Sequence, residues 1–118
     1  MAGSYFNKIA NLLKQLRPRL AATHRLEFKN CFGAVAGYVD GRIFISCGKF
    51  GVALRLPSEV LADLFIREKD VKHLKYFPKG HIKREYAILP KRIIENKPKF
   101  KKLVDKSIKY ASLKNSVY

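Results

Sequence analysis

The chain has 118 residues, of which 47% are hydrophobic, so it can bury the core of one domain and is not generally disordered. Its 25 Lys and Arg residues outnumber 9 Asp and Glu residues, which gives a net charge of +16. This charge favours polyanionic partners such as nucleic acid, an anionic membrane or an acidic protein, unless it only reflects a Lys-rich proteome.

A basic amphipathic helix is predicted at the start of the chain. Apolar residues recur at helical spacing from Phe6 to Leu16, and Ser4 is the expected cap. Pro18 lies just beyond, so the helix should end or kink near Leu16. The segment before Glu27 has no acidic residue, which is also typical of a mitochondrial presequence or a membrane-surface helix. Burial of the apolar side against a sheet is the simpler interpretation.

Three strands are predicted to follow, over residues 26–39, 42–47 and 52–56. The dipeptide Asp40-Gly41 between the first two strands is a strong signal for a tight hairpin. In the register set by this turn, Phe44 lies opposite Gly37. Gly33 and Gly37 interrupt the first strand, and such glycines usually mark bulges or close backbone approach.

The cysteines indicate the compartment. Cys31 and Cys47 are the two cysteines, and they form no Cys-x-x-Cys motif. In the predicted register Cys31 lies opposite Phe50 and Cys47 opposite Ala34, so the two are not a cross-strand pair. We therefore expect two free thiols in a reducing, cytoplasmic compartment. No apolar run approaches the roughly 18 residues of a membrane span, so integral membrane association is not expected.

The second half of the chain adds a helix, two strands and a final helix. Pro57 ends the third strand and Ser58 is the expected cap of the next helix. Two strands are then predicted over residues 74–77 and 82–89. Pro90 starts a short helical turn, Pro98 suits the first turn of the last helix, and residues 114–118 are expected to form a flexible tail. The prediction is one α+β domain over residues 1–118, ordered helix, three strands, helix, two strands, helix.

No catalytic constellation is visible. His24, His73 and His81 are isolated, and the carboxylates are scattered without the spacing of a metal site or a catalytic pair. The glycines of the hairpins are not followed by Gly-Lys-Ser/Thr, so they do not form a phosphate loop. We therefore predict a protein that is not an enzyme and uses no metal, cofactor or small-molecule substrate.

Basic residues concentrate in the last third of the chain and favour contact with nucleic acid. Lysine dominates, which suits phosphates better than base edges, so binding should be non-specific and sensitive to salt. Aromatic residues nearby could stack on unpaired bases, although such residues are more often core; they are Tyr76, Phe77, Tyr86 and Tyr110. The residues predicted to contact phosphates are Lys99, Lys101, Lys102, Lys106 and Lys109, supported by Lys91, Arg92, Lys83 and Arg84.

The element order and several short motifs resemble the N-terminal domain of the TfoX/Sxy family, bacterial proteins linked to natural competence. The motifs are Cys31-Phe32-Gly33, Tyr38-Val39-Asp40-Gly41, Ile43-Phe44, Leu54-Arg55-Leu56, Tyr76-Phe77 and Tyr86-Ala87-Ile88-Leu89-Pro90. The similarity covers residues 6–111, but Cys31 stands where the family usually has Met, and Ala34 to Ala36 replace a glycine-richer run. Full-length family regulators also carry a helical C-terminal domain, which is not found in these 118 residues.

The resemblance implies a two-layer sandwich of helices on an antiparallel sheet, similar to secretion-chaperone-like domains. It also implies a non-catalytic role in transcription regulation, with DNA binding through phosphates. The alternative function is a protein-interaction module, chaperone-like or dimerising, whose partner is an acidic protein or a second copy of the chain.

Overall fold

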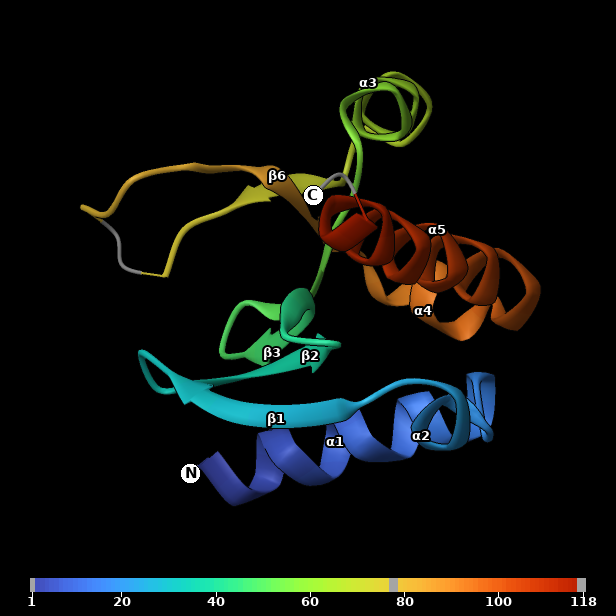
Figure 1. Cartoon of the computed structure of the whole chain (residues 1–118). Helices are drawn as coiled ribbons and strands as arrows, with labels where there is room; N and C mark the ends of the chain where they lie inside the picture. Colours follow the sequence, from blue (N-terminus) through green and yellow to red (C-terminus); the bar gives the residue numbers. More distant parts are fainter. Residues whose placement is uncertain (1, 77–78, 117–118) are drawn as a thin grey trace.

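The computed structural model describes residues 2–76 and 79–116, with side chains over 3–76 and 79–113. Six strands form one antiparallel sheet, and helices pack against it (Figure 1). The strands are β1 (Leu26–Cys31), β2 (Ala34–Val39), β3 (Arg42–Gly48), β4 (Gly51–Arg55), β5 (Lys72–Leu74) and β6 (Lys83–Leu89). The helices are α1 (Ala2–Leu16), α2 (Leu20–Thr23), α3 (Ser58–Arg67), α4 (Lys91–Glu95) and α5 (Lys97–Ser116).

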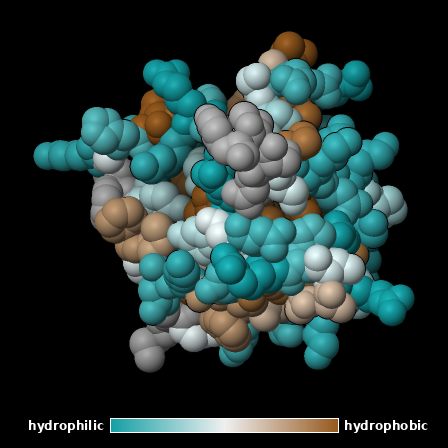
Figure 2. Space-filling model, in the orientation of Figure 1, coloured by the Kyte–Doolittle hydropathy of each residue, from teal (hydrophilic) through white to brown (hydrophobic). Residues whose placement is uncertain are grey.

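The strands follow the order β1-β2-β3-β4-β6-β5 across the sheet. Helices α1 and α5 both pack on β2 and β3, α5 also reaches β4, and α3 lies against β6. This arrangement confirms the predicted α+β class. Figure 2 shows that hydrophilic residues cover most of the viewed face and that hydrophobic ones gather in small patches.

The first predicted strand is in fact a hairpin, so the sheet has one strand more than the sequence suggested. Residues Phe32 and Gly33 form its turn, with φ angles of 51° and 81°. Two positive φ angles are the signature of a tight hairpin turn, and Asn, Asp or Gly normally supply them. Because Phe rarely adopts this conformation, nothing in the sequence marked Phe32 as a turn residue.

The Asp40-Gly41 turn is confirmed, with φ angles of 50° and 83°, but the register beyond it differs from the prediction. A bulge between Gly37 and Tyr38 shifts the pairing by one residue, so Gly37 lies opposite Ile45 instead of Phe44. A Cβ atom at Gly37 would lie 2.7 Å from the Cγ2 atom of Ile45, so only glycine fits this close approach without displacement.

The bulge and the extra hairpin also change the predicted partners of the cysteines. Cys47 lies opposite Val35 instead of Ala34, and Cys31 ends β1 opposite Ala34 instead of Phe50. Both are free thiols, as predicted. Burial raises the pKa of the Cys47 thiol, which keeps it protonated and unreactive.

Helix ends follow the prolines more closely than the predicted caps. The first helix ends at Leu16, as Pro18 predicts, but it begins at Ala2, so Ser4 lies inside the helix. Its apolar side is buried in the core, which supports the interpretation of a helix packed on the sheet. Pro57, not Ser58, is the N-cap of α3, and no side chain caps it. In the described part of the chain, no helix is both long and apolar enough to cross a membrane.

The short strand β5 occupies residues 72–74 and not 74–77 as predicted. Tyr76 therefore lies beyond the end of β5, and its hydroxyl lies 3.2 Å from Oγ of Ser46 in β3. Phe77 lies outside the described residues. The predicted tail begins within α5, whose backbone is helical to Ser116, and residues 117 and 118 are not described.

Helix α5 is held on the sheet by an apolar stripe and one buried hydroxyl. The stripe is Phe100, Leu103, Val104, Ile108 and Ala111. The Ser107 hydroxyl lies 2.6 Å from the carbonyl oxygens of both Phe44 and Arg55, so that its one hydrogen is shared between the two acceptors. These carbonyls lie just beyond the last pair of the β3–β4 ladder, Ile45↔Leu54, so Ser107 supplies the donor that the neighbouring strand does not.

Replacement of Ser107 by alanine is expected to lower the free energy of unfolding by about 1–3 kcal/mol, because two buried carbonyls lose their donor. Ser112 on the same helix is the matched control, since its buried hydroxyl has no partner in the described structure. Ser112→Ala should leave stability unchanged or raise it slightly. Urea unfolding followed by circular dichroism measures both, and equal effects of the two variants would contradict the role given to Ser107.

Candidate nucleic-acid interface

The exposed face of α5 carries three lysines that no described carboxylate pairs with. Lys102, Lys106 and Lys109 follow each other at spacings of four and three residues, which places them on one side of the helix. All three are exposed, because the apolar stripe of α5 faces the sheet. The helix is fixed at its start by Asn96, whose Oδ1 accepts a hydrogen bond of 3.3 Å from the backbone N–H of Lys99.

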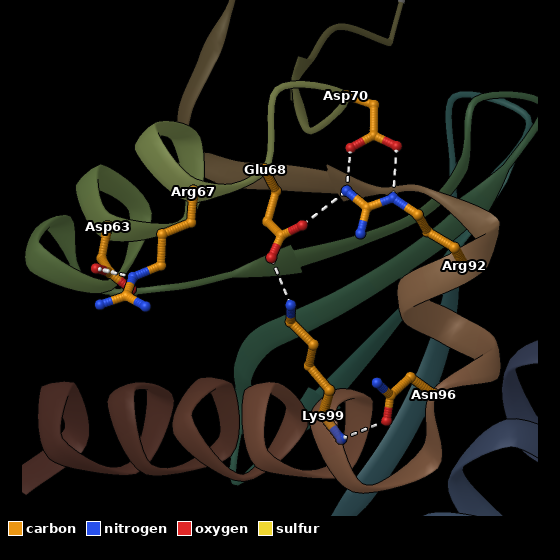
Figure 3. Close-up of polar contacts among 7 residues, drawn as sticks. All are labelled: Asp63, Arg67, Glu68, Asp70, Arg92, Asn96 and Lys99. Carbon is orange, nitrogen blue, oxygen red and sulfur yellow. Dashed lines mark hydrogen bonds and ion pairs between the residues drawn. The ribbon is translucent and has the colours of Figure 1, made fainter.

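Other predicted binding residues form ion pairs with acidic side chains, as Figure 3 shows. Glu68, at the end of α3, accepts from Lys99 of α5 and lies 2.7 Å from Nη2 of Arg92 of α4. Arg92 also binds both carboxylate oxygens of Asp70. The Glu68 side chain is only 12% exposed, so Lys99 and Arg92 join three helices and their charges are already matched.

Lys101 and Lys91 are also paired. Lys101 Nζ lies 3.0 Å from Asp105, which also binds Arg17 of the loop after α1. Lys91 Nζ lies 3.8 Å from Glu95, four residues along α4. The structure therefore removes four of the nine predicted residues from the group of unmatched cations; they are Lys91, Arg92, Lys99 and Lys101.

The pairing of Glu68 and Asp70 makes stability depend on pH. The hydrogen bond from Lys99, and then that from Arg92, lowers the pKa of Glu68, and Arg92 lowers that of Asp70. Carboxyls whose pKa is lower in the folded state stabilise it above the unfolded-state value and lose that contribution as pH falls. We expect the unfolding temperature to drop between about pH 5 and pH 2, and Glu68→Gln/Asp70→Asn to show a smaller drop. An equal drop in the unfolding temperature of the wild type and the double variant would contradict the stabilising role of these two carboxylates.

Two of the unmatched lysines line a groove between α3 and α5. The groove has a volume of about 730 Å³ and also contains Arg84 of β6. Its apolar lining is Leu56, Pro57, Val60, Leu61, Tyr110 and Leu113. The cations Arg84, Lys106 and Lys109 therefore surround an apolar floor, and none of the three has an ion pair in the described structure.

Tyr110 is held firmly in this groove. Its hydroxyl donates to Glu85 Oε1 at 3.0 Å, and the guanidinium carbon of Arg55 lies 5.1 Å from the centre of its ring. Arg55 Nε donates to the same carboxylate oxygen at 2.9 Å, so the charge of Glu85 is matched. Burial, and then the bond to Glu85, raises the pKa of Tyr110, which keeps the hydroxyl a donor.

The remaining predicted residues lie on either side of this groove. Lys102 lines an adjacent hollow of about 600 Å³ together with Lys99 and Arg67. Lys83, at the start of β6, is not among the residues that line the groove, whereas Arg84 is. The structure thus brings Arg84, Lys102, Lys106 and Lys109 into one strip, which we call the basic strip, and places Lys83 outside it.

Of the three described aromatic residues that were predicted to stack on bases, only Tyr110 is part of the groove. Tyr76 packs against Phe32 and Phe50 at ring distances of 5.5 and 5.8 Å, and burial raises its pKa to about 12. Burial also raises the pKa of Tyr86. These two tyrosines belong to the packed structure, as the core interpretation predicted.

The sequence did not mark the apolar part of the groove. Leu113 lies off the buried stripe of α5 and is 52% exposed, and Val60 stands beside the buried positions of α3. The one indication in the sequence was that Leu113 is apolar although it falls outside the helical spacing of the stripe of α5. The described residues include no group of three His, Cys, Asp or Glu side chains arranged to hold a metal ion.

The chain matches no protein-family model, no curated protein and no solved structure. The resemblance to the TfoX/Sxy N-terminal domain is therefore a prediction from the sequence motifs alone. The groove and the basic strip are the features of the structure that bear on function.

Proposed function

We propose that this protein is a non-catalytic accessory or regulatory protein that contacts nucleic acid through the phosphate backbone. The observation that carries the proposal is the basic strip, in which Lys102, Lys106, Lys109 and Arg84 have no described acidic partner while neighbouring cations do. Cations without an acidic partner can neutralise phosphates and thereby release the counterions that are condensed on the nucleic acid. The resemblance to a competence regulator points to the same kind of ligand.

The chemistry of the strip favours contact without base reading. Three of its four cations are lysines, which act as point charges and suit single phosphate oxygens. Among the described residues that line the groove there is no Asn or Gln to form a paired hydrogen bond with a base edge. Affinity should therefore depend on salt much more than on sequence.

The test is a fluorescence-anisotropy titration of labelled DNA of random sequence at several salt concentrations. The logarithm of the affinity should fall linearly with the logarithm of the salt concentration, with a slope of about −3 to −4 for four phosphate contacts. Binding that is strong but nearly independent of salt would contradict phosphate contact. A stronger interaction with an acidic polypeptide such as polyglutamate would support the alternative protein-binding module instead.

A further inference from the structure

We propose that the groove between α3 and α5 holds an unpaired base of a single strand whose phosphates lie on the basic strip. This inference rests on the proposed function and adds the form of nucleic acid that is bound. It explains the feature that phosphate contact alone leaves unexplained, namely the apolar floor between Arg84, Lys106 and Lys109.

The floor has the properties of a base-binding surface. The half-buried Val60 and the exposed Leu113 supply apolar contact above the buried Leu56 and Leu61, and the Tyr110 ring supplies a π surface beside them. Bases stack on aromatic side chains with little regard to sequence, because every base has a π face. The hydrogen bond to Glu85 and the contact with Arg55 fix the ring before any ligand binds, so little conformational entropy is lost on binding.

The dimensions also fit a short single-stranded segment. Lys102 and Lys109 are seven residues apart on α5, which is about 10 Å along the helix axis. A stacked strand rises about 3.4 Å per nucleotide, so the strip extends along about three nucleotides. In a duplex the bases are paired inside the helix, and only the hydrophilic backbone would then cover the apolar floor.

Glu59 gives an independent test of phosphate placement at the groove. It lines the groove at the first turn of α3, is exposed, and has no ion pair in the described structure. Its carboxylate accepts from the Ser58 hydroxyl at 3.3 Å, and its charge is close enough to Tyr110 to contribute to the raised pKa of that residue. Its charge should repel a bound phosphate. We expect Glu59→Gln to strengthen binding of both single-stranded and duplex DNA by about two- to fivefold at low salt.

The experiment compares labelled oligothymidylate with a duplex of equal length in one buffer. The intact chain should bind the single strand at least about fivefold more tightly. Tyr110→Leu, which keeps an apolar side chain but removes the ring, should weaken single-strand binding by about fivefold and leave duplex binding unchanged. Leu113→Gln tests the apolar lining at a 52% exposed position and should likewise weaken single-strand binding.

The outcomes separate the two proposals. Equal affinity for single strand and duplex, with no effect of Tyr110→Leu or Leu113→Gln, overturns the base-binding role but leaves phosphate contact standing. If the intact chain shows no salt-sensitive binding to either single-stranded or duplex DNA, the proposed function is overturned as well. Displacement of oligothymidylate by a much lower concentration of an acidic amphipathic peptide would assign the groove to a protein ligand.

Discussion

Reversal of Lys102, Lys106 and Lys109 to glutamate is expected to weaken DNA binding by about 100-fold at low salt. Each lysine is exposed and lacks a described acidic partner, so each can neutralise one phosphate. The slope of log affinity against log salt should become shallower by about 2 to 3, because about 0.7 to 0.9 of a counterion is released per contact. Anisotropy titrations at several salt concentrations give both numbers.

The control for this variant is a second triple reversal with the same change in net charge. Lys8 and Lys14 of α1 and Lys49 of the β3–β4 turn are exposed and line neither the groove nor the adjacent hollow. Their reversal should reduce affinity much less, because they contribute only to the long-range field. Equal losses for the two triple variants would mean that net charge, and not the basic strip, determines binding.

Phe100→Ala is expected to lower the free energy of unfolding by about 3–5 kcal/mol. Phe100 is the largest side chain of the buried stripe of α5 and is 1% exposed. Its removal leaves a cavity in the core near Leu16 of α1 and Ile94 of α4, which the packed neighbours can fill only in part. Since α5 carries Lys102, Lys106 and Lys109, this contact connects the stability of the fold with the position of the basic strip.

Urea unfolding of the wild type, Phe100→Ala and Phe100→Leu measures this contribution. The leucine variant keeps most of the apolar volume and should lose less than about 1.5 kcal/mol. A loss of less than about 1 kcal/mol for the alanine variant would show that α5 is not held by this side chain.

Much of the fold could be predicted because its determinants are local. The Asp40-Gly41 turn, the helix end before Pro18 and the helical turn after Pro90 depend on backbone preferences of single residues. The Phe32-Gly33 turn was missed for the opposite reason, since Phe at a positive φ angle is set by the packing of the hairpin and not by its own preference.

The candidate site was harder to predict because it depends on contacts between distant segments. Lys99 and Lys102 are equivalent in the sequence, but Glu68 reaches Lys99 from 31 residues away. Arg92 is matched in the same way by Asp70, 22 residues away. Only the packing of α3 beside α5 shows which lysines stay unmatched, and the groove exists only between these two helices.

The most direct test of the basic strip as the binding site is a nuclear magnetic resonance titration of the labelled chain with a short oligothymidylate. If the basic strip is the binding site, backbone amide shifts change most in residues 56–61, 84–85 and 102–113, which line the groove and the strip. Changes concentrated around Lys8, Lys14 and Lys49, or spread evenly over the basic residues, would contradict that assignment.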